Sequence, residues 1–565
     1  MNVGIVGSGP GAGAVESALA DVDADVTSVE TGEIGEHALT VVVGRAGDAA
    51  FERASERAVA TGARWLAVEL GGVGGIPIVD AAVAGFSPET GCYECLTGRV
   101  SANLDAQAEP AATPAAHTGR FAGAVAGREA ARFVSERADI FGRVVVVPFD
   151  EREFLPLPNC ACADGDTGRL SREWVDRDVD AALARAERAV DDLLGIVTDV
   201  GEAESFPLPY YLAHGCETAG FSDASAAQDA AGVDPDWNRA FMKGLGEALE
   251  RYCAGVYRTE TFETGSPGEV AGAVDPGAFV TQHDPDVDTL HWVGGENLAT
   301  GEDAWIPAEF VYYPPPTSQF RSPVTTGLGL GNSDTEALLA GLYEVIERDA
   351  MMLSWYSSFE PLGLALDDDG FETIAARARS ESLSVTPLLL TQDVDVPVVA
   401  VAVHREQWPR FALGTGAHLD VARAARSAAS EALQNWMELR GMGESEAADA
   451  LGAIGRYADR PDTVSSFVGT GTTIPAESAG PTDVATGTDQ LEDVLDRVEA
   501  AGLTAYGVGT TTRDVDRLGF EAVRAVVPGA QPLCFGDIYF GERAESVPIE
   551  LGFEPRLDRE HHPFP

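Results

Sequence analysis

Lysine is almost absent from this 565-residue chain, in which Lys243 is the single example. The 38 basic residues are outnumbered by 91 acidic residues, and the formal net charge is −53. Nucleic acids and anionic membranes are themselves negatively charged, so a surface of this kind repels them. The composition therefore argues against a nucleic-acid-binding or membrane-surface protein.

Long apolar runs are also missing. No uninterrupted stretch approaches the roughly 18 apolar residues that span a bilayer, and the basic and apolar regions of a secretory signal do not follow Met1. We therefore expect a cytoplasmic protein with no membrane partner. The acidic, lysine-poor composition resembles that of proteins from salt-accumulating haloarchaea, in which carboxylates keep the protein hydrated. The charge then reflects a halophilic solvent more than a partner.

Cysteine is scarce, and its count of seven is odd, which argues against a disulfide framework in a long cytosolic chain. Four of the cysteines form two close pairs, Cys92-x-x-Cys95 and Cys160-x-Cys162. Two such pairs can close a tetrahedral four-thiolate site, for which zinc is the suitable metal. The alternatives are a redox-active CxxC or two unrelated thiol pairs. We predict a structural Zn²⁺ site.

A phosphate-binding loop of the GxxxxGK[ST] type is absent too, so any bound ATP needs carboxylate-held Mg²⁺ and arginines to neutralise its phosphates. The stretch from Thr325 to Ala350 fits this need. A Gly-rich loop precedes a helix predicted from about Asp334 to Ala350, with Ser333 and Glu336 at the spacing of a capping box. At 100° per residue one arc of this helix is apolar and the other carries acidic side chains, among them Glu336, Glu344 and Glu347. The alternative is a solvated acidic face with Glu344 and Arg348 as an exposed pair.

The pattern Glu-x-x-Glu-Arg occurs twice, as Glu247 to Arg251 and as Glu344 to Arg348. Two such helices facing one another can hold metal ions, and a third segment, the helix after Asp420, adds Arg426 and Glu431. These segments favour a site for Mg²⁺ and ATP. The predicted ligands are Glu247, Glu250, Arg251, Glu336, Glu344, Glu347, Arg348, Arg426 and Glu431.

The chain opens with a strand, a glycine loop from Gly7 to Gly13, a helix and a second strand ending at Glu30. This βαβ order predicts a Rossmann-like domain, either as a nucleotide site or as a scaffold alone. The overall fold class is α/β followed by α+β. We predict a first domain over residues 1–165, a helical connector over 166–205 that includes a helix-prone stretch from Arg169 to Thr198, and a second domain over 206–565.

The glycine loop, TGCYECL at 90–96 and PNCAC at 158–162 together look like the ThiF/ubiquitin-activating-enzyme-like docking domain of peptide cyclodehydratases. The resemblance implies that this domain presents a peptide and has lost adenylation. It also implies a precursor peptide as substrate. A separate leader-binding protein, a dehydrogenase or a sulfur-donor protein is a candidate further partner, and a homodimer is expected.

The second half resembles the YcaO family in four stretches: LGEALERY, TTGLGLGNSDTEALLAGLYEVIERDA, GAHLDVARAARSAASEALQ and DVDRLGFEAVRAVVPGAQPL. YcaO proteins use Mg-ATP to activate a peptide amide. The resemblance implies that Glu247, Glu250, Glu344 and Glu347 are metal or phosphate ligands, with Asn332 and Glu336 nearby.

The chain ends in Pro563-Phe564-Pro565, preceded by His561 and His562. Prolines favour an extended tail, and the resemblance implies that the Pro565 carboxylate acts as a catalytic base. The alternative is a disordered terminus with solvent-facing histidines. The predicted activity is formation of thiazoline or oxazoline rings, as in thiazole/oxazole or bacteriocin biosynthesis. Peptide thioamidation, or a non-catalytic ATP-binding assembly or regulatory role, are the alternatives.

Overall fold

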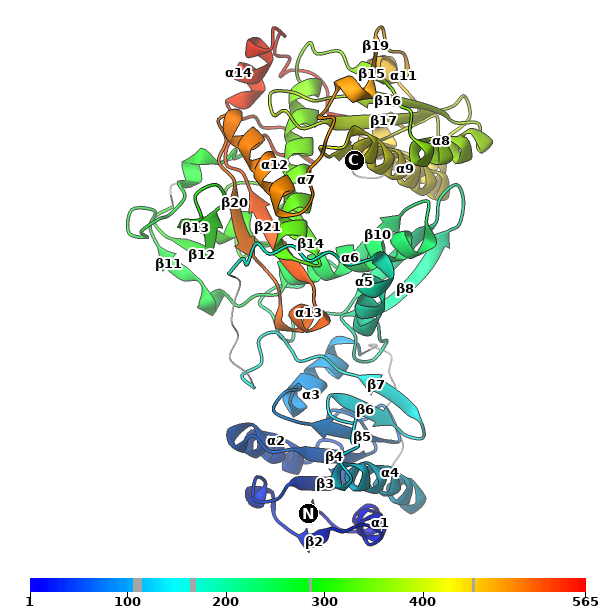
Figure 1. The fold of residues 1–565 in the computed structure, drawn as a ribbon, viewed down its shortest axis with the longest axis vertical. Helices are drawn as coiled ribbons and strands as arrows, with labels where there is room; N and C mark the ends of the chain where they lie inside the picture. The colour runs from blue at the N-terminus through cyan, green and yellow to red at the C-terminus, as the bar shows by residue number, and fades with distance from the viewer. Residues whose placement is uncertain (105–113, 163–168, 284–286, 450–452) are drawn as a thin grey trace.

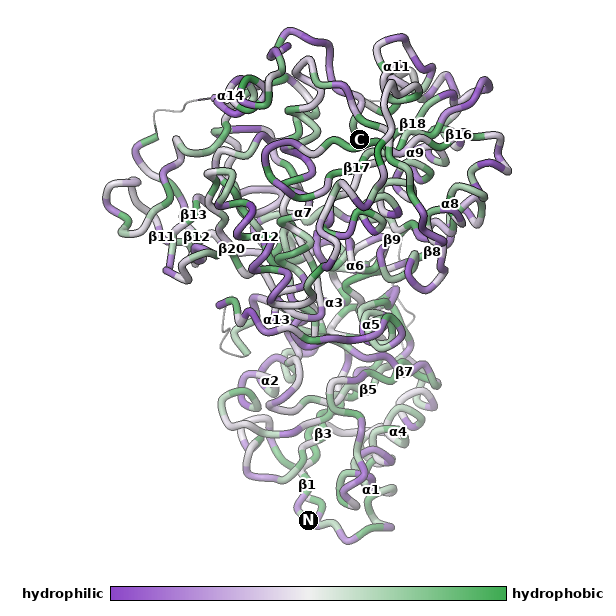
Figure 2. The backbone as a smooth tube through the Cα atoms, turned by 45° about the horizontal axis from the view of Figure 1, so that its top comes forward, coloured by the Kyte–Doolittle hydropathy of each residue, from purple (hydrophilic) through white to green (hydrophobic). Residues whose placement is uncertain are grey.

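The structure is a computed structural model, and it describes residues 1–104, 114–162, 169–283, 287–449 and 453–565. Two bodies follow one another along the long axis of the molecule, a smaller N-terminal one and a larger one that holds the rest of the chain (Figure 1). None of the described helices has the length and apolar character needed to cross a membrane. The hydrophobic colour runs along buried strands such as β3 and β17 (Figure 2).

The N-terminal body is built on a seven-stranded sheet of order β2-β1-β3-β4-β5-β6-β7. The first four of these strands are parallel and the last three antiparallel. Helices α1 and α4 pack on one face, and α2 and α3 on the other. The bounds are β1 Asn2–Val6, α1 Pro10–Leu19, β2 Asp25–Ser28, β3 Leu39–Arg45, α2 Ala49–Thr61, β4 Trp65–Leu70, β5 Ala81–Phe86, α3 Tyr93–Ala102, α4 Ala116–Val134, β6 Arg143–Val146 and β7 Asp150–Glu153.

The glycine loop between β1 and α1 is explained by backbone geometry and packing. Gly7 has a φ of 108°, in the region that favours glycine. A Cβ on Gly123 of α4 would lie 2.2 Å from the carbonyl oxygen of Gly11 in α1, so the two helices touch through glycine. Close helix packing therefore accounts for this loop without a bound nucleotide, which favours the scaffold alternative.

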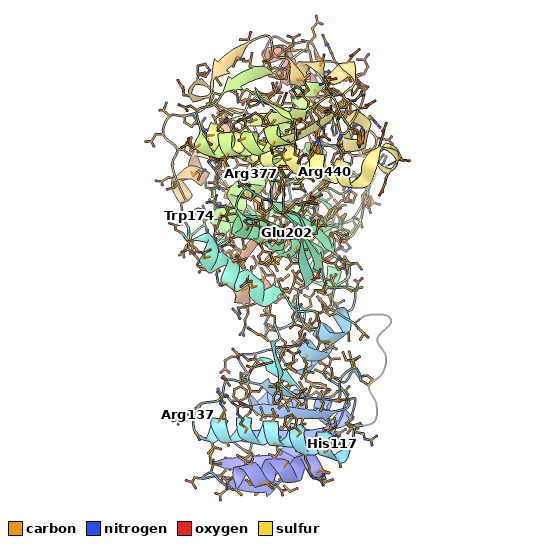
Figure 3. All side chains as sticks on the ribbon, turned by 90° about the vertical axis from the view of Figure 1, so that its right-hand side faces the viewer. His117, Arg137, Trp174, Glu202, Arg377 and Arg440 are labelled. Carbon is orange, nitrogen blue, oxygen red and sulfur yellow. The ribbon has the colours of Figure 1, made fainter. Side chains whose placement is uncertain are left out.

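The predicted helical connector is wrong over most of its length. Residues 169–178 are not helical, α5 covers only Val179–Ala186, and β8 begins at Val197. Tertiary contacts outweigh helix propensity here: Leu170 packs in the main core, and Arg172 binds the Glu296 carboxylate at 2.6 Å. Trp174 lies against the larger body, next to Gly487 (Figure 3).

The larger body contains three further sheets among the described residues. Their orders are β10-β9-β8, then β11-β12-β20-β21-β14 with β13 paired to β12, and β18-β17-β16-β15-β19. Strands β12 and β13 form an antiparallel hairpin. The strand bounds are β8 Val197–Glu204, β9 Tyr210–Gly215, β10 Asp229–Val233, β11 Glu263–Gly265, β12 Leu290–Asn297, β13 Asp303–Pro307, β14 Leu328–Gly331, β15 Leu362–Ala365, β16 Ser384–Leu389, β17 Val398–His404, β18 Phe411–Ala417, β19 Thr473–Pro475, β20 Tyr506–Gly509 and β21 Glu521–Val526.

Helix α7 lies at the centre of the larger body and begins at Asp334, as predicted (Figure 1). It continues to Trp355, beyond the predicted end at Ala350, because Met351, Met352 and Leu353 remain buried in the core. On its acidic arc Glu347 is buried and Glu336 and Glu344 are only partly exposed, so the alternative of a fully solvated surface does not hold. The other helices are α6 Trp237–Gly255, α8 Asp369–Ser380, α9 Val421–Asp449, α10 Ala453–Tyr457, α11 Ser465–Val468, α12 Thr488–Ala500, α13 Arg513–Leu518 and α14 Arg543–Glu550.

A buried ion pair joins the two bodies. Arg99 of α3 contacts the Asp514 carboxylate in α13, and both side chains are fully buried. The Tyr252 hydroxyl of α6 donates to the same carboxylate at 2.7 Å. Removing one partner of such a pair leaves an uncompensated charge and costs about 3–5 kcal/mol. The network fixes the cysteine-bearing helix α3 against α6, which carries Glu247 and Glu250.

Candidate functional site

A cavity of about 580 Å³ opens where α6, α7 and α9 meet. Carboxylates from all three helices line it: Glu247 and Glu250 from α6, Glu336 from α7 and Glu431 from α9. Three segments that lie far apart in the sequence therefore contribute to one cavity, which we call the carboxylate cavity.

The α6 pair has two different environments. Glu247 accepts a hydrogen bond from the Ala231 amide at 2.7 Å and is bound by Arg251. Glu250 accepts no hydrogen bond from any described residue. Burial, together with the negative charges of Glu344 and Glu247, raises the pKa of Glu250 to about 8. An unpartnered, crowded carboxylate of this kind is suited to a cation.

Glu344 is held by the glycine loop that precedes α7. The Gly327 amide donates to its carboxylate at 2.9 Å, while Arg348 lies 3.8 Å away. Gly327 has a φ of 92°, and a Cβ there would meet the Ala525 carbonyl oxygen at 2.2 Å. The glycine is therefore required for the loop to approach the helix and present its amide to Glu344.

Glu347 and Glu431 are joined through Thr415 of β18. The Thr415 hydroxyl donates to Glu347 at 2.6 Å, and the Thr415 amide donates to Glu431 at 2.5 Å. Burial raises the pKa of Glu347 to about 7, although the nearby Arg348 favours its charged form. Burial also raises the pKa of Glu431. Arg348 is thus surrounded by acidic groups from two helices.

Asn332 and Glu336 form a third group at the start of α7. The Asn332 amide and side-chain nitrogens both donate to Glu336, at 2.8 and 2.9 Å. Ser333 caps the helix, as predicted, by accepting from the Glu336 amide at 3.4 Å. Arg185 of α5 donates to the Asn332 side-chain oxygen. The segment between the two bodies therefore contributes to the wall of the cavity.

Five of the predicted site residues line the carboxylate cavity, namely Glu247, Glu250, Asn332, Glu336 and Glu431, whereas Arg251, Glu344, Glu347, Arg348 and Arg426 do not. The Arg426 guanidinium instead binds the Asp368 carboxylate at 2.6 Å, at the start of α8. Lys243, in contrast, lies on the cavity wall and pairs with Asp234 at 2.8 Å. Sequence reasoning excluded this lysine from a phosphate-binding loop and gave it no other role.

Three further residues at the site were missed: Arg185, Thr415 and Arg524. Arg524 of β21 is buried and experiences the charges of Glu344 and Glu250. Burial, assisted by the neighbouring Arg321, lowers its pKa to about 9. The signal was present for Arg524, since a lone arginine in the apolar strand Glu521–Val526 is unusual for a core position. Nothing local marks Arg185 or Thr415.

The ligand atoms that the carboxylate cavity offers are suited to Mg²⁺. The cavity presents several carboxylate oxygens and no thiolate or imidazole, and hard oxygen ligands are those that Mg²⁺ prefers. Glu250 in particular has a free carboxylate for a cation. The residues that would hold the ion come from α6 and α7, with Glu431 from α9.

The C-terminal tail is ordered and runs into the core. Phe564 is fully buried against Trp355 and Phe467, and His562 contacts the Cys534 carbonyl at 2.8 Å. Arg348 donates to the backbone oxygen of Pro565 at 3.0 Å. The alternative of a disordered terminus with a solvent-facing His562 is therefore wrong. Pro565 lies beside the arginine of the second Glu-x-x-Glu-Arg pattern.

The four predicted cysteines come together in the N-terminal body. The sulfur atoms of Cys92 and Cys160 are 3.5 Å apart, those of Cys95 and Cys162 3.6 Å, and those of Cys92 and Cys95 3.8 Å. A tetrahedral ion with metal–sulfur bonds of about 2.3 Å has sulfur–sulfur edges of about 3.8 Å. The cluster therefore fits a metal ion, and the alternative of unrelated thiol pairs is excluded.

Known proteins similar to this chain include two uncharacterized proteins. One, from Methanothermobacter thermautotrophicus, is 29% identical over 331 residues, which cover 56% of this chain and 85% of that protein. The other, in the tfuA 3' region of Rhizobium leguminosarum bv. trifolii, is 25% identical over 277 residues, which cover 45% of this chain and 64% of that protein.

Solved structures share the fold. A heterocyclase in complex with substrate and cofactor has a TM-score of 0.74 and 19% identity, covering 98% of this chain and 83% of its own. The heterocyclase TruD has a TM-score of 0.68 and 18% identity, covering 99% and 82%. YcaO from Methanopyrus kandleri, bound with AMPPCP and Mg²⁺, has a TM-score of 0.52 and 22% identity, covering 66% and 96%.

The family described as YcaO cyclodehydratase, ATP- and Mg²⁺-binding, matches residues 231–531. This span covers more than half of the sequence and includes α6, α7, α9 and Arg524. The chain belongs to the YcaO family.

Proposed function

We propose that this protein is an ATP-dependent cyclodehydratase of a ribosomally made peptide. In this reaction the γ-phosphoryl group of ATP is transferred to the oxygen of a backbone amide, and a neighbouring Cys, Ser or Thr side chain attacks the amide carbon. The amide oxygen leaves as phosphate, and a thiazoline or oxazoline ring, ADP and phosphate are the products. The observation that carries the proposal is the convergence of carboxylates from three helices on one cavity.

The residues divide into two proposed roles. Glu247, Glu250, Glu344 and Glu347 hold Mg²⁺, which, when bound, neutralises phosphate charge during transfer. Asn332, Glu336 and Glu431 complete the wall on the nucleotide side. Arg251 and Arg348 contact phosphate oxygens. Arg426 is left out of the phosphate contacts, because Asp368 already holds its guanidinium.

The tail supplies the proposed base. The Pro565 carboxylate, positioned by Arg348 and by the buried Phe564, takes the proton of the attacking side chain. Arg348 contacts Pro565 and lies beside Glu344. The proposed base and the proposed phosphate ligands are therefore both positioned by α7.

Residues 1–165 are proposed to form a ThiF-like docking domain that presents the peptide. Its proposed structural zinc is bound by Cys92, Cys95, Cys160 and Cys162. Residues 166–205 connect it to the YcaO domain over 206–565. The heterocyclase with substrate and cofactor supports this division, since its fold similarity covers 98% of the chain. We also propose that the protein forms a homodimer in a high-salt cytoplasm. Its further partner would be a separate leader-binding protein, a dehydrogenase or a sulfur-donor protein.

The test is phosphate release from ATP, with and without the precursor peptide, in buffers of high salt. The expected result is peptide-dependent release together with loss of one water from the peptide by mass spectrometry. Exchange of one oxygen for sulfur would instead identify a thioamidating enzyme. Nucleotide binding without any peptide-dependent turnover would contradict the proposal and indicate an assembly or regulatory protein.

A further inference from the structure

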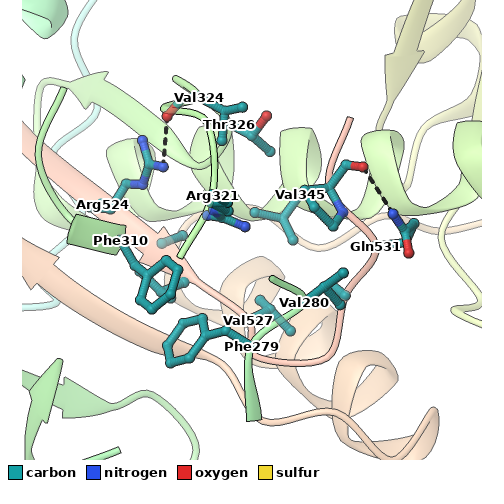
Figure 4. A pocket seen from close by; sticks show the side chains of 14 residues that line it. Phe279, Val280, Phe310, Arg321, Val324, Thr326, Val345, Arg524, Val527 and Gln531 are labelled. Atoms are coloured by element: carbon teal, nitrogen blue, oxygen red, sulfur yellow. Dashed lines mark hydrogen bonds between the residues drawn. The ribbon is translucent and has the colours of Figure 1, made fainter. Parts of the chain in front are cut away.

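A second, smaller cavity of about 40 Å³ lies beside the segment that precedes α7 (Figure 4). Two arginines, Arg321 and Arg524, share its lining with Thr326 and Gln531, and the Phe310 ring forms part of its apolar wall. One ordered water needs roughly 10–15 Å³ measured in this way, so the space admits about three waters or one small oxyanion. We call it the arginine cavity.

The two guanidinium groups lack an acidic partner. Arg524 donates to the backbone oxygens of Val324 and Thr325, both at 2.9 Å, and is 2% exposed. The Arg321 guanidinium lies 4.9 Å from the centre of the Phe310 ring. Among the described residues, no carboxylate forms an ion pair with either guanidinium. Two close positive charges without a counter-ion are unfavourable inside a protein.

The nearest candidate counter-ion is already engaged. The Glu309 carboxylate accepts hydrogen bonds from the amides of Gln319, Phe320 and Arg321, at 2.9, 2.7 and 3.2 Å. These bonds orient Glu309 towards the backbone of the Arg321 segment, and its oxygens do not contact the Arg321 guanidinium. The positive charge of the arginine cavity therefore remains available to an anion from outside.

The arginine cavity lies beside the loop and helix that hold Glu344. Thr326 and Val345 line it, while their sequence neighbours Gly327 and Glu344 are hydrogen-bonded to each other. Arg524 links this cavity to the carboxylate cavity, because it experiences the negative charges of Glu344 and Glu250 and the positive charge of Arg321. Arg524 of the arginine cavity is therefore within electrostatic range of Glu250, which lines the carboxylate cavity.

We propose that the arginine cavity binds inorganic phosphate, as the receiving site for the phosphate that the reaction releases. Guanidinium groups match tetrahedral oxyanions through paired hydrogen bonds, and the Thr326 hydroxyl and the Gln531 side chain line the same space. The role of the site in turnover rests on the proposed function, whereas phosphate binding itself does not. Arg321 and Thr326 from one segment and Arg524 from β21 then serve one anion, whereas the Gln531 side chain is held in place by hydrogen bonds to Pro532, Tyr539 and Gly541.

The test is calorimetric titration of the full-length protein with inorganic phosphate, without nucleotide and at constant ionic strength in potassium chloride. Wild type and Arg379→Gln are expected to bind alike, because Arg379 is exposed and paired with Glu372. Arg321→Gln is expected to weaken binding roughly tenfold or more, the loss expected for a charge-assisted hydrogen bond. Equal binding by Arg321→Gln, or no binding by wild type, would overturn the proposal.

Two further measurements test the same site independently of the Arg321 variant. Thr326→Val keeps the shape of the wall and removes one donor, so a loss of roughly three- to tenfold is expected even if Arg321→Gln does not fold. Saturation with AMPPCP and Mg²⁺ should leave phosphate binding intact, and displacement of phosphate would place it in the nucleotide site and refute the arginine cavity. If the protein binds phosphate through Arg321 but no Mg-nucleotide, the proposed function fails while this site stands.

Discussion

Arg348, near the middle of α7, donates a hydrogen bond to the backbone oxygen of Pro565, 217 residues later in the chain, at 3.0 Å. The same guanidinium lies 3.8 Å from Glu344 and is surrounded by the charges of Glu347 and Glu431. One side chain therefore connects the end of the chain with the acidic groups of two helices. This contact motivates the first prediction.

Phe564→Ala is expected to detach the C-terminal tail from the aromatic rings that pack around it. Phe564 is fully buried against Trp355, and loss of such a ring costs about 3–5 kcal/mol of stability. Below the melting temperature, peptide-dependent phosphate release should fall at least about tenfold, since a small misplacement of a reacting group is enough for this. Mg-nucleotide affinity should change little.

The matched control is Phe149→Ala, because Phe149 is 79% exposed. It should leave turnover and melting temperature near the wild-type values. Unchanged turnover in Phe564→Ala would show that the position of the tail does not matter for the reaction.

Replacing Glu344 and Glu347 together by glutamine is expected to weaken Mg-AMPPCP binding by roughly a hundredfold or more, which is about 2.8 kcal/mol. Both carboxylates would lose their charge while keeping their size, and Gly327 and Thr415 would keep a hydrogen-bond partner. Calorimetry measures the effect. Glu372→Gln, on an exposed helix face, is the control, and equal affinities in all three proteins would refute the metal assignment.

The pH dependence of stability should report on Glu250. Its pKa in the folded protein is raised to about 8, so folding favours the protonated form. The stabilising contribution is complete below about pH 4.5 and is lost as the pH rises to about 8. In metal-free buffer, Glu250→Gln should therefore be more stable than wild type at pH 8.5, by up to about 5 kcal/mol, and similar to it at pH 4.5. Thermal melts across this range measure the difference, and parallel curves for the two proteins would contradict the prediction.

Replacing Cys92 and Cys95 by serine should remove one equivalent of bound metal. The sulfur separations of 3.5 to 3.8 Å match a tetrahedral thiolate site, and two serine hydroxyls are poor replacements for thiolates. Elemental analysis of the purified protein measures the loss, with zinc as the expected metal. Cys216→Ala, which removes a buried cysteine outside the cluster, should retain the metal. A wild-type protein purified without metal would refute the site.

Local features of the site were predictable from the sequence. Ser333 marks the start of α7, the three-residue spacing places Glu344 and Glu347 within one turn of a helix, and the two cysteine pairs have the spacing of metal ligands. These features depend on helix geometry and on neighbours within a few residues, which the sequence displays directly. The parallel strands of the N-terminal sheet were predictable for the same reason.

Contacts between distant segments decided the rest. Residues 169–178 have the composition of a helix, yet they form neither helix nor strand, because Leu170 packs into the main core and Arg172 binds Glu296. Arg426 has the right charge for phosphate, but Asp368, 58 residues away, holds it.

The sequence by itself therefore determined which helices carry the carboxylates and which cysteines pair, since both follow from short, regular spacings. The tertiary structure alone decided that carboxylates from three helices meet in one cavity, that Thr415 joins Glu347 to Glu431, and that Pro565 reaches Arg348. The physical reason is that such contacts depend on how buried surfaces pack, and packing brings together residues that are separated by hundreds of positions in the chain.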